Sequence, residues 1–537
     1  MRPPRRITVT DPRAVKAFFA KPREQFEWVK KLKRDELEKE LSGLDPPPSF
    51  HNKLMLHQKA CFLIGVAFPQ FLFLLDMGTG KTALVLELLR YHFRTGLLKR
   101  KVLVLCPTNV VVDTWSEQIE KHAPDLPFAL LKGAGADKWA AFDELKSGLV
   151  ICTYQGFLTM VSEKEEHKRK KRKVLVVQRR LVNLIAKNIE GLVLDESTAI
   201  KNKQSLWFRA ARAVSKQTEV RYGMAGRAFG RDPLDLWAQF FLIDRGESLG
   251  PTLGLFRSAF YEQKAGHWTM FVYKFKQEME DQLHRIMGHR SIRFSADECI
   301  DLPPITKIVR HIDLPEETEG YYRRIVAEVV AARGNLRAIK NAFLRMRQIS
   351  SGFLGFRDSD TGDKAEIEFT ENPKLDELME LLDEMPLDRK AVVVCEFTWS
   401  GRRICKALAD AGIGHLWLWS GTSKNYAADK KRFESDPKLR VWVVNHRAAG
   451  YGANLQAANY IFFYESPVSA IDRDQTERRV RRTGQQHRVF QYDLVVRNTA
   501  DERILAFHRE GGDLWSSVVR DAKQRPNERG SAKSARK

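Results

Sequence analysis

Several features that define other protein classes are scarce in this sequence of 537 residues. Its six cysteines have neither the CxxC nor the Cys/His spacing of metal ligands, which argues against a zinc site and a disulfide framework. The longest apolar region, Cys61 to Leu75, is interrupted by Pro69 and Gln70 and falls short of the ~20 residues that span a bilayer. The basic start of the chain, Met1 to Arg6, lacks the apolar stretch of a secretory signal. The thiols are therefore expected to be reduced.

Acidic residues are fewer than basic residues in this sequence. Lys and Arg number 90 against 68 Asp and Glu, which leaves a formal charge of +22 at pH 7. Such an excess indicates a polyanionic partner, although a basic chain that is merely soluble is the alternative. Hydrophobic residues at 43% and charged residues at 29% are typical of globular proteins and exclude wholesale disorder. At ~100 to 200 residues per domain, the length predicts two or three packed units.

Short apolar runs alternate with helical stretches in two separate blocks. Runs of this kind are typical of strands buried on both faces, and their alternation with helices predicts parallel sheets built from βαβ units. The first block contains the runs Phe71 to Leu75, Lys101 to Cys106, Leu149 to Thr153, Leu192 to Leu194 and Arg221 to Ala225. The second block contains Ala391 to Cys395, His415 to Trp419, Val441 to Asn445, Tyr460 to Tyr464 and Val489 to Val495. Two α/β domains are therefore expected.

Three other regions do not follow this alternation. From about Leu234 to Asn372 the pattern is helical and strongly charged, which predicts helical insertions and a connector. The run Lys164 to Lys173 and the tail from Arg520 to Lys537 are basic and look irregular. The run is interpreted as a phosphate-gripping loop, a solvated charge run or a nuclear localisation signal.

The strongest chemical signal is a glycine-rich turn, Asp76 to Thr82, placed directly after the first strand and before a helix over Ala83 to Phe93. Backbone N–H groups of such a turn approach phosphate oxygens, and the N-terminus of the following helix adds a positive dipole end. Lys81 would reach the β and γ phosphates, and the Thr82 hydroxyl would bind Mg²⁺. The strict GxxxxGK[ST] pattern requires Gly at the position of Leu75, so the match is to a relaxed version. A glycine-rich turn without a phosphate ligand is the alternative.

Paired carboxylates supply the second half of a hydrolytic site. Asp195 and Glu196 directly follow the apolar run Gly191 to Leu194. Asp195 would hold Mg²⁺, directly or through water, and Glu196 would orient and deprotonate the attacking water. Two acids at a strand end also occur in plain turns, but together with the upstream turn they predict a hydrolytic site.

A third element, Gln475 to Gln485, lies in the second block. Its residues Arg479 and Arg482 are three apart, so on a helix they project from one face. If the two domains close over one nucleotide, such arginines stabilise the charge that develops on the γ phosphate. A solvated basic helix, or one that contacts DNA, is the alternative.

In their order along the chain, these segments resemble the motifs of helicase superfamily two, and within it the Swi/Snf-like branch of double-stranded DNA translocases. The resemblance extends from about His51 to Phe507. Its most branch-specific part is Asp195 to Asn202, a DEAH-type motif II with a trailing Ile-Lys-Asn. The other matching segments are Leu56 to Gln58 (Q motif), Pro107 and Thr108 with Trp115 (Ia), Thr153 and Tyr154 (Ib), Leu302 to Pro304 and Leu344 to Gln348 (inter-lobe segment), Pro373 to Leu375 (start of lobe two), Ala391 to Thr398 (IV), Gly421 to Ser423 (backbone-contact loop), Asn445 to Leu455 (V) and Gln475 to Gln485 (VI).

The resemblance implies an α/β fold with two RecA-like parallel-sheet lobes in tandem and helical insertions between them. It also implies a compact member of the branch, similar to bacterial or bacteriophage proteins. The expected division is an N-terminal extension at 1–45, an ATP-binding lobe at 46–235, a helical insertion and connector at 236–371, a second lobe at 372–515 and a disordered basic tail at 516–537.

The resemblance assigns roles to individual residues, with ATP and Mg²⁺ as cofactors. The implied catalytic residues are Lys81, Asp195, Glu196, Gln475, Arg479 and Arg482. The implied nucleotide-binding residues are Gln58, which would read adenine, together with Met77, Gly78, Thr79, Gly80, Lys81, Thr82 and Gly452. Thr82 and Asp195 would bind the metal. The implied contacts to the DNA backbone are Thr108, Thr153, Thr422 and Arg447.

Three motifs depart from the family's pattern. Motif III usually reads Thr-Gly-Thr-Pro, whereas Ala225 to Ala228 read Ala-Gly-Arg-Ala, so the hydroxyls that help couple nucleotide state to the lobe interface are missing. Motif II carries Ser197 and Thr198 in place of Ala-His, and Arg481 stands where motif VI often has His. ATPase activity is still expected because the hydrolysis residues are intact, while the strength of mechanical coupling is left open.

The resulting expectation is a monomeric, ATP-dependent motor that tracks along DNA, most simply double-stranded, without sequence preference and without a membrane partner. Its expected location is the cytoplasm of a bacterial or phage-infected cell, with the nucleus as the alternative. Two other functions stay open: an RNA or single-strand helicase of another branch, and a non-hydrolysing DNA-binding regulator that retains the fold.

Overall fold

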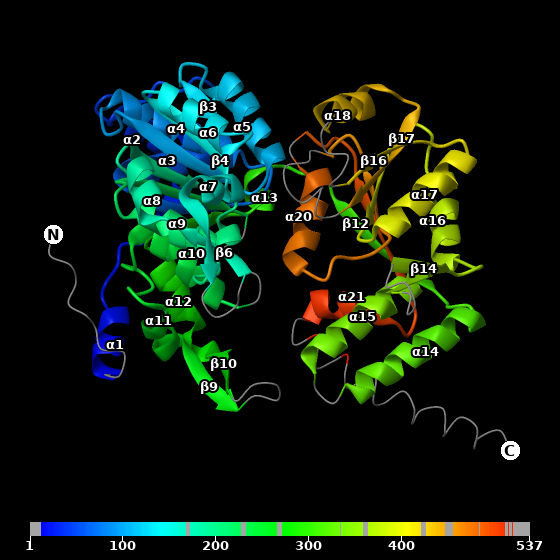
Figure 1. Ribbon diagram of the computed structural model, residues 1–537. Helices are drawn as coiled ribbons and strands as arrows, with labels where there is room; N and C mark the ends of the chain where they lie inside the picture. Colours follow the sequence, from blue (N-terminus) through cyan, green and yellow to red (C-terminus); the bar gives the residue numbers. More distant parts are fainter. Residues whose placement is uncertain are drawn as a thin grey trace. The chain divides into compact units, whose positions relative to one another are not determined.

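The computed structural model describes residues 12–167, 172–226, 232–265, 271–332, 335–357, 364–419, 426–445, 455–482 and 484–510, together with residues 514 and 518. The chain divides into two units, each with its own sheet (Figure 1). The first unit comprises Met1–Lys264 and Phe271–Asp301, and the second comprises Ala265–Met270 and Leu302–Lys537.

The first unit is built on a seven-stranded sheet with the strand order β11-β1-β8-β7-β2-β4-β3, and all its pairs are parallel. Its strands are β1 (Gln70–Leu75), β2 (Lys101–Cys106), β3 (Phe128–Leu130), β4 (Gly148–Thr153), β7 (Ile189–Leu194), β8 (Val220–Ala225) and β11 (Ser291–Phe294). Every apolar run of the first block forms one of these strands, as predicted. The central strands are almost fully buried, because helices cover both faces of the sheet.

Two groups of helices cover the two faces of this sheet. One face packs on α3 (Leu56–Ala67), α4 (Lys81–Arg94) and α5 (Asn109–His122). The other face forms the main core of the unit with α7 (Tyr154–Val161), α8 (Arg179–Ala186), α9 (Leu206–Ser215), α10 (Leu234–Asp244), α11 (Leu253–Phe260) and α12 (Glu280–Met287). α6 (Gly135–Glu144) lies beside β3 and α7. The 3₁₀ turns η2 (Ser197–Ile200) and η3 (Gln277–Met279) also belong to this unit.

The start of the chain is folded onto the first unit from residue 12 onward. It forms α1 (Pro12–Phe19), the 3₁₀ turn η1 (Glu27–Lys31) and α2 (Arg34–Ser42). Val15 and Phe19 of α1 belong to the main core of the unit. The expected extension at 1–45 therefore contains a packed helix, although its boundary stays a prediction.

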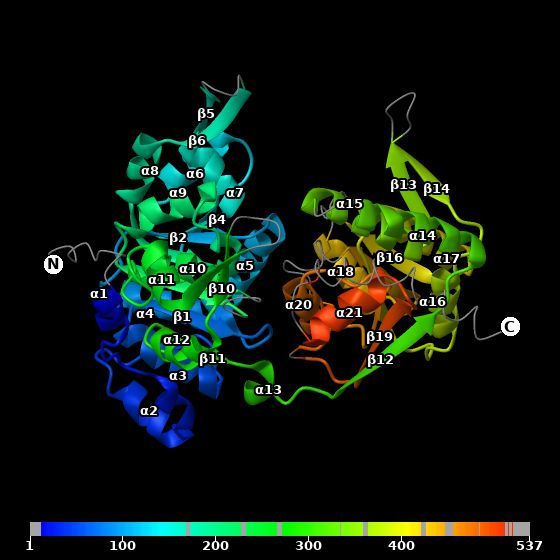
Figure 2. The same ribbon diagram turned by 90° about the horizontal axis from the view of Figure 1, so that it is seen from below.

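Residues 164–167 and 172–173 of the basic run Lys164 to Lys173 are not irregular, which corrects the expectation from the sequence for these residues, while 168–171 lie outside the described residues. The described residues of the run belong to an antiparallel hairpin of β5 (Ser162–His167) and β6 (Arg172–Val177), which projects from the first unit in Figure 2. The apolar residues Leu175 and Val177 pack against the core and anchor the base of the hairpin. The charge pattern concealed this strand pair, because only β6 carries an apolar run.

The second unit contains a six-stranded parallel sheet with the order β12-β19-β18-β15-β17-β16. Its strands are β12 (Ile305–Ile312), β15 (Ala391–Cys395), β16 (Gly414–Leu418), β17 (Leu439–Asn445), β18 (Tyr460–Phe463) and β19 (Val489–Val496). All five runs of the second block form strands here, and the predicted α/β class with two parallel sheets is confirmed.

Helices again cover both faces of this sheet. One face packs on α16 (Pro373–Asp383) and α17 (Thr398–Asp410), and the other on α18 (Tyr426–Ser435) and α20 (Ala470–Val480). A separate apolar cluster joins α14 (Glu316–Ala331), α15 (Leu336–Ser350) and α21 (Ala500–Glu510).

The segment at 236–371, expected to be helical, is shared between the two units and also contains strands. Within it lie β11, β12, the hairpin β9 (Tyr261–Ala265) with β10 (Phe271–Phe275), the hairpin β13 (Phe353–Arg357) with β14 (Lys364–Glu368), and the short helix α13 (Ala296–Cys299). The expected tail at 516–537 lies outside the described residues, apart from Val518.

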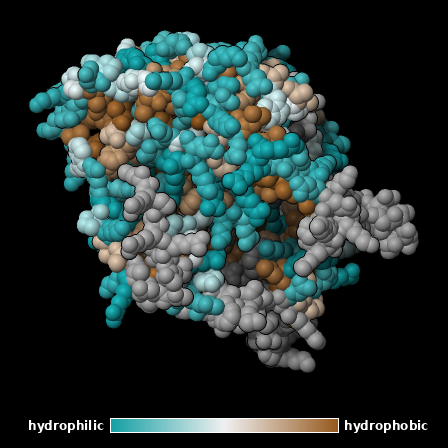
Figure 3. Space-filling model, turned by 60° about the vertical axis from the view of Figure 1, so that its left-hand side comes forward, coloured by the Kyte–Doolittle hydropathy of each residue, from teal (hydrophilic) through white to brown (hydrophobic). Residues whose placement is uncertain are grey.

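The face shown in Figure 3 is largely polar. Most of its coloured residues are hydrophilic, with scattered apolar patches. Among the described residues, no helix combines the length and apolar character that crossing a membrane requires.

Candidate active site

The glycine-rich turn connects β1 to α4, as the sequence predicted, and its backbone is strongly constrained. Gly78 has φ 83° and Gly80 has φ 77°, a left-handed conformation that residues with a Cβ rarely adopt. α3 holds the turn in place, because Gln58 Nε2 donates to the carbonyl oxygens of Thr79 and Gly80, both at 3.1 Å. His57 Nε2 lies 2.8 Å from the same Thr79 oxygen.

Gln58 is buried between these backbone groups. Its Oε1 accepts from the N–H of Met55 at 2.8 Å while its amide nitrogen holds the turn. The structure therefore gives this side chain a role that the sequence did not indicate. It shapes the glycine-rich turn Asp76 to Thr82, which is here called the phosphate turn after its predicted ligand. The predicted role in reading adenine stays a prediction.

The two halves of the predicted hydrolytic site come together in the first unit. Lys81, the first residue of α4, places Nζ 3.8 Å from Glu196 Oε1, and both side chains are 11% exposed. This Nζ is buried and makes no hydrogen bond to any described part of the chain. A largely desolvated ammonium with spare donors is chemically suited to a phosphate group.

The Asp195 carboxylate is fixed by its neighbours. Its Oδ2 accepts from the Trp115 indole N–H at 2.8 Å, and its Oδ1 accepts from the backbone N–H of Glu196 at 2.9 Å. The Tyr154 hydroxyl donates to the Asp195 carbonyl oxygen at 2.8 Å. Burial raises the pKa of Asp195, and the neighbouring Glu196 raises it further, whereas Trp115 and Lys81 lower it. A bound cation would relieve this unfavourable burial of charge.

Glu196 lies in a strained backbone conformation, with φ 45° and ψ 60°. Such strain in a residue other than glycine is typical of functional sites, where it fixes the direction of a side chain. Ser197 stands where motif II of the family usually has Ala. Its hydroxyl is accommodated by a buried hydrogen bond, which it donates to Gln239 Oε1 at 2.7 Å.

The donor set fits a nucleotide with its metal ion. Thr82 follows Lys81 in the first turn of α4, and Asp195 directly follows β7, next to Glu196. Mg²⁺ in nucleotide sites takes one or two protein oxygen ligands and completes its shell with phosphate oxygens and water. Thr82 and Asp195 would hold it, and it would neutralise charge on the phosphates.

The predicted arginines lie in the second unit, but not on one helix. Gln475 and Arg479 are on α20, which ends at Val480, so Arg482 follows the helix. The expectation that Arg479 and Arg482 project from one helix face was therefore wrong. The reason is a change of backbone direction at Arg481, where ψ reaches 86°.

Arg479 is buried and Arg482 is partly buried. Arg479 is 8% exposed, and burial lowers the pKa of Arg482. The turn that carries them is clamped by Gln485, whose Nε2 donates to the carbonyl oxygens of Gln456 at 3.1 Å and Ala458 at 2.8 Å. Gln456 directly follows Leu455, the last residue of the segment that resembles motif V.

Two of the predicted DNA contacts lie at one edge of the first sheet. Thr108 and Thr153 directly precede α5 and α7; Thr153 is the last residue of β4, and Thr108 lies two residues after the end of the neighbouring strand β2. The Thr153 hydroxyl accepts from the N–H of Gly156 at 2.8 Å. The buried Thr108 Oγ1 has no hydrogen-bond partner within the described ranges. Three further predicted residues lie outside the described residues, namely Thr422, Arg447 and Gly452.

A cleft of about 370 Å³ opens beside Thr153. Its lining consists of Leu131, Lys132, Gly133, Lys138, Thr153, Gln155, Gly156 and Thr159. Lys138 of α6 is only 9% exposed, and its Nζ donates to Thr159 Oγ1 at 3.0 Å. No carboxylate of the described residues forms an ion pair with Lys138. No pattern in the sequence pointed to this residue, because its burial depends on the packing of α6 against α7.

A family model, the SNF2-related domain, matches residues 56–359, which is more than half of the 537 residues. The chain belongs to the SNF2-related family. The family resemblance predicted from the motifs is thereby confirmed. The roles of individual residues in this SNF2-related chain stay predictions.

Several known proteins are similar to most of this chain. An uncharacterized ATP-dependent helicase of Mycoplasma genitalium is 21% identical over 462 residues, which are 83% of this chain and 40% of the relative. The CHD3-type chromatin-remodeling factor PICKLE of Arabidopsis thaliana is 21% identical over 488 residues, which are 83% of this chain and 32% of the relative. The chain thus spans less than half the length of these relatives. The solved SWI2/SNF2 ATPase core of Sulfolobus solfataricus in complex with double-stranded DNA is 22% identical, with a TM-score of 0.39 over 89% of this chain and 98% of that chain.

Proposed function

We propose that this chain is an ATP-dependent translocase on double-stranded DNA. The observation that carries the proposal is the position of Lys81, whose ammonium lies 3.8 Å from Glu196 at the end of the phosphate turn, with Asp195 next in the chain. The names of the relatives, which include an ATP-dependent helicase and a chromatin-remodeling factor, support a motor function.

Hydrolysis would use residues of both units. Lys81 would exchange its contact with Glu196 for the β and γ phosphates, which leaves the Glu196 carboxylate to orient a water molecule and accept its proton. Arg479 and Arg482 of the second unit would stabilise the charge that develops on the γ phosphate. Gln475 would assist them from the preceding turn of α20.

The DNA would be held through its backbone. The cleft beside Thr153 presents the buried ammonium of Lys138 and the hydroxyls of Thr153 and Thr159, which suit a phosphodiester oxygen. Contacts of this kind carry no base information, so binding would tolerate any sequence. The formal charge of +22 supports a polyanionic partner of considerable length.

The test of hydrolysis compares phosphate release by the wild type with that by Lys81→Ala and Glu196→Gln. Glu196→Gln should lose at least about a hundredfold in rate, because a general base contributes about 10²–10⁴. Lys81→Ala should lose a similar factor, because removal of one electrostatic donor to the developing charge costs about 10²–10³. The exposed residues Lys146 and Glu117 provide the matched controls Lys146→Ala and Glu117→Gln, which should keep the wild-type rate. Equal rates for the wild type and all the variants would refute the enzyme and favour the non-hydrolysing regulator.

The test of the track measures stimulation of hydrolysis by duplex DNA, single-stranded DNA and RNA, followed by displacement of a triplex-forming strand from the duplex. Stimulation by duplex DNA together with displacement is expected. Stimulation by RNA alone would contradict the proposed substrate and favour the helicase of another branch.

A further inference from the structure

The segment Ser295–Pro304 connects the two units and is here called the connector. It contains the short helix α13 and leads into β12, and the chain passes from the first unit to the second between Asp301 and Leu302. Each end of the connector is hydrogen-bonded within its own unit to a residue beside the proposed hydrolytic machinery.

The first end is bonded to Asp76, the residue that opens the phosphate turn. The backbone N–H of Asp76 donates to Phe294 O at 3.1 Å, and its Oδ2 accepts from the N–H of Ala296 at 3.0 Å. The carbonyl oxygen of Asp76 accepts from the Thr79 hydroxyl inside the turn at 2.7 Å. Asp76 is 1% exposed, so one buried residue holds both the phosphate turn and the start of the connector.

The second end is bonded to Arg481, the residue directly before Arg482 in motif VI. Arg481 Nε donates to Pro303 O at 2.9 Å. The carbonyl oxygen of the next connector residue, Pro304, accepts from the N–H of Val489 at 3.0 Å and starts the pairing of β12 with β19. The departure from His to Arg in motif VI thus has a structural partner in the connector.

The connector between these two bonds is short and stiff. From Ala296 to Pro303 there are seven peptide steps, which span at most ~25 Å when fully extended. The ring of each of the two consecutive prolines, Pro303 and Pro304, fixes φ and removes an N–H. α13 is closed by a capping box between Ser295 and Glu298, which resists unwinding.

We infer that Asp76 and Arg481 are positioning residues that couple the phosphate turn to the arginine-bearing turn through the connector. The inference rests on the proposed function and adds a route for coupling. When either unit moves, the connector is pulled or compressed. Its hydrogen bonds to Asp76 and Arg481 transmit this force to the phosphate turn and to the turn that carries Arg482. This route needs none of the motif III hydroxyls that Ala225 to Ala228 lack.

The principal test lengthens the connector without changing a side chain. A Gly-Gly-Ser-Gly-Gly insertion after Asp301 gives slack between the two bonded ends, and the same insertion after Leu387, an 81% exposed loop residue of the second unit, is the matched control. The measured quantity is the number of triplex strands displaced per ATP hydrolysed on duplex DNA. The insertion after Asp301 should lower this ratio about tenfold, in line with the effect of mutations along coupling networks. The control insertion should leave it unchanged.

A second variant addresses the bond itself. Arg481→His restores the usual family residue but removes the guanidinium that reaches Pro303, and it should lower the same ratio while duplex-stimulated hydrolysis stays within about twofold. Unchanged ratios in both the Asp301 insertion and Arg481→His would overturn the inference, provided that the wild type hydrolyses ATP and displaces the strand. A wild type without duplex-stimulated hydrolysis would overturn the proposed function, and this inference with it.

Discussion

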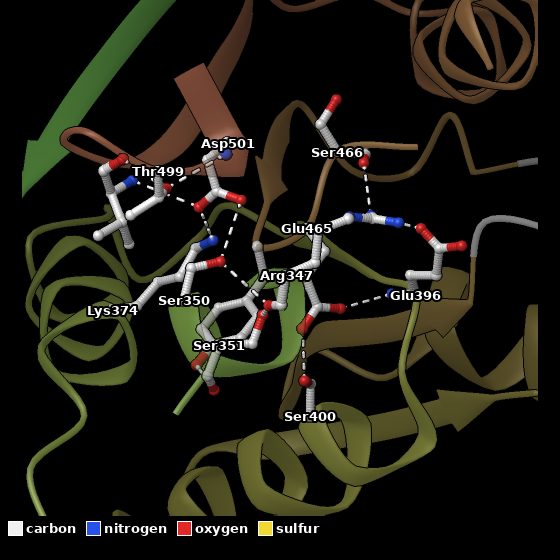
Figure 4. A network of polar contacts seen from close by, with 12 residues as sticks. Arg347, Ser350, Ser351, Lys374, Glu396, Ser400, Glu465, Ser466, Thr499 and Asp501 are labelled. Atoms are coloured by element: carbon white, nitrogen blue, oxygen red, sulfur yellow. Dashed lines mark hydrogen bonds and ion pairs between the residues drawn. The ribbon is translucent and has the colours of Figure 1, made fainter. Parts of the chain in front are cut away.

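Lys374 Nζ lies 2.6 Å from Asp501 Oδ2 inside the second unit, and the lysine side chain is only 1% exposed. The pair joins the first turn of α16 to the first turn of α21 (Figure 4). Asp501 Oδ1 also accepts from the Ser350 hydroxyl at 3.3 Å, which ties α15 to the same point. A buried charge pair of this kind holds three helices in register, because either charge alone would be costly to bury.

A second buried pair lies in the same network. Arg347 of α15 pairs with the Glu396 carboxylate at 2.5 Å and donates to Ser466 O at 2.9 Å. Glu465 accepts from the N–H of Glu396 at 2.6 Å and also from the Ser400 hydroxyl (Figure 4). Burial raises the pKa of Glu465, while its bond from Ser400 lowers it. The network therefore connects Glu396, in the segment that resembles motif IV, to α15, which contains the predicted inter-lobe segment Leu344 to Gln348.

Removal of one partner from the Lys374–Asp501 pair should destabilise the second unit strongly. Lys374→Met leaves the Asp501 carboxylate buried without its counter-charge and should cost about 3–5 kcal/mol of unfolding free energy. The double variant with Asp501→Asn should recover part of this loss, because the amide is neutral and keeps an acceptor. The exposed pair Lys406–Asp410 supplies the control Lys406→Met, with an expected change under about 0.5 kcal/mol. Urea unfolding measures all three, and equal losses for Lys374→Met and Lys406→Met would contradict the prediction.

His92 should make the stability of the first unit depend on pH. The Tyr222 hydroxyl donates to Gly65 O at 2.7 Å, so His92 Nε2 at 2.6 Å must be the donor to that hydroxyl. Burial lowers the pKa of His92 from 6.5 to about 4. Below pH 6.5 the unfolded chain binds the proton first, so stability is fully present above about pH 6.5 and falls progressively until about pH 4, by an amount on the order of 3 kcal/mol.

The test compares unfolding free energies between about pH 7 and pH 4 for the wild type and His92→Gln, which keeps a donor but does not titrate. The variant should lose less stability over this range than the wild type. His284→Gln, at a largely exposed histidine, should follow the wild-type curve. Parallel curves for the wild type and His92→Gln would show that His92 does not carry the dependence.

Trp115→Phe should weaken the response of hydrolysis to Mg²⁺. The substitution removes the indole N–H that fixes Asp195 Oδ2 and keeps most of the apolar contact. Asp195 is a proposed metal ligand, and loss of the outer partner of a metal ligand typically costs about 10–100-fold in affinity or activity, so on this proposal the Mg²⁺ concentration for half-maximal ATPase activity should rise about tenfold. Trp237→Phe, which removes an indole bond to Gly250 O elsewhere in the unit, should leave this concentration unchanged. An equal Mg²⁺ requirement in Trp115→Phe and the wild type would contradict the prediction.

Gly80→Ala should abolish nucleotide binding. A Cβ at this position would lie 2.1 Å from Gln58 Nε2, and the backbone φ of 77° is itself unfavourable for alanine. Gly320→Ala is the matched control, because the added Cβ meets nothing within 4 Å and the residue lies within α14. The control should gain about 0.5–1 kcal/mol of stability from helix propensity. Titration with a fluorescent nucleotide and thermal unfolding measure the two effects, and undiminished binding by Gly80→Ala would contradict the prediction.

The sequence predicts most of the parallel strands well because each is a continuous apolar run between helices. It misses β11, a strand of four residues with an exposed Arg293, because its pairing with β1 joins segments far apart in the chain. The β5–β6 hairpin is missed because charged side chains dominate β5, and its pairing partner supplies the apolar residues.

For the site, local order along the chain predicts the turn with Lys81 and the acids Asp195 and Glu196, which the structure places together. The contacts of Trp115 with Asp195 and of Gln58 with the turn depend on tertiary packing, so no local pattern reveals them. The end of α20 before Arg482 likewise depends on where the following turn docks.

Lys138→Gln should weaken duplex DNA binding in a way that salt reveals. If the buried ammonium contacts one phosphate, its loss should reduce the slope of log K against log salt by about 1, with the same effect on every DNA sequence. The exposed Lys146, just after the same helix, provides the control Lys146→Gln, which should change neither slope nor affinity. Thermal unfolding separates this role from a structural one, because Lys138 has no carboxylate partner among the described residues and its removal should not destabilise the fold. An unchanged salt slope, or a lower unfolding temperature with unchanged DNA affinity, would place Lys138 outside the DNA contact.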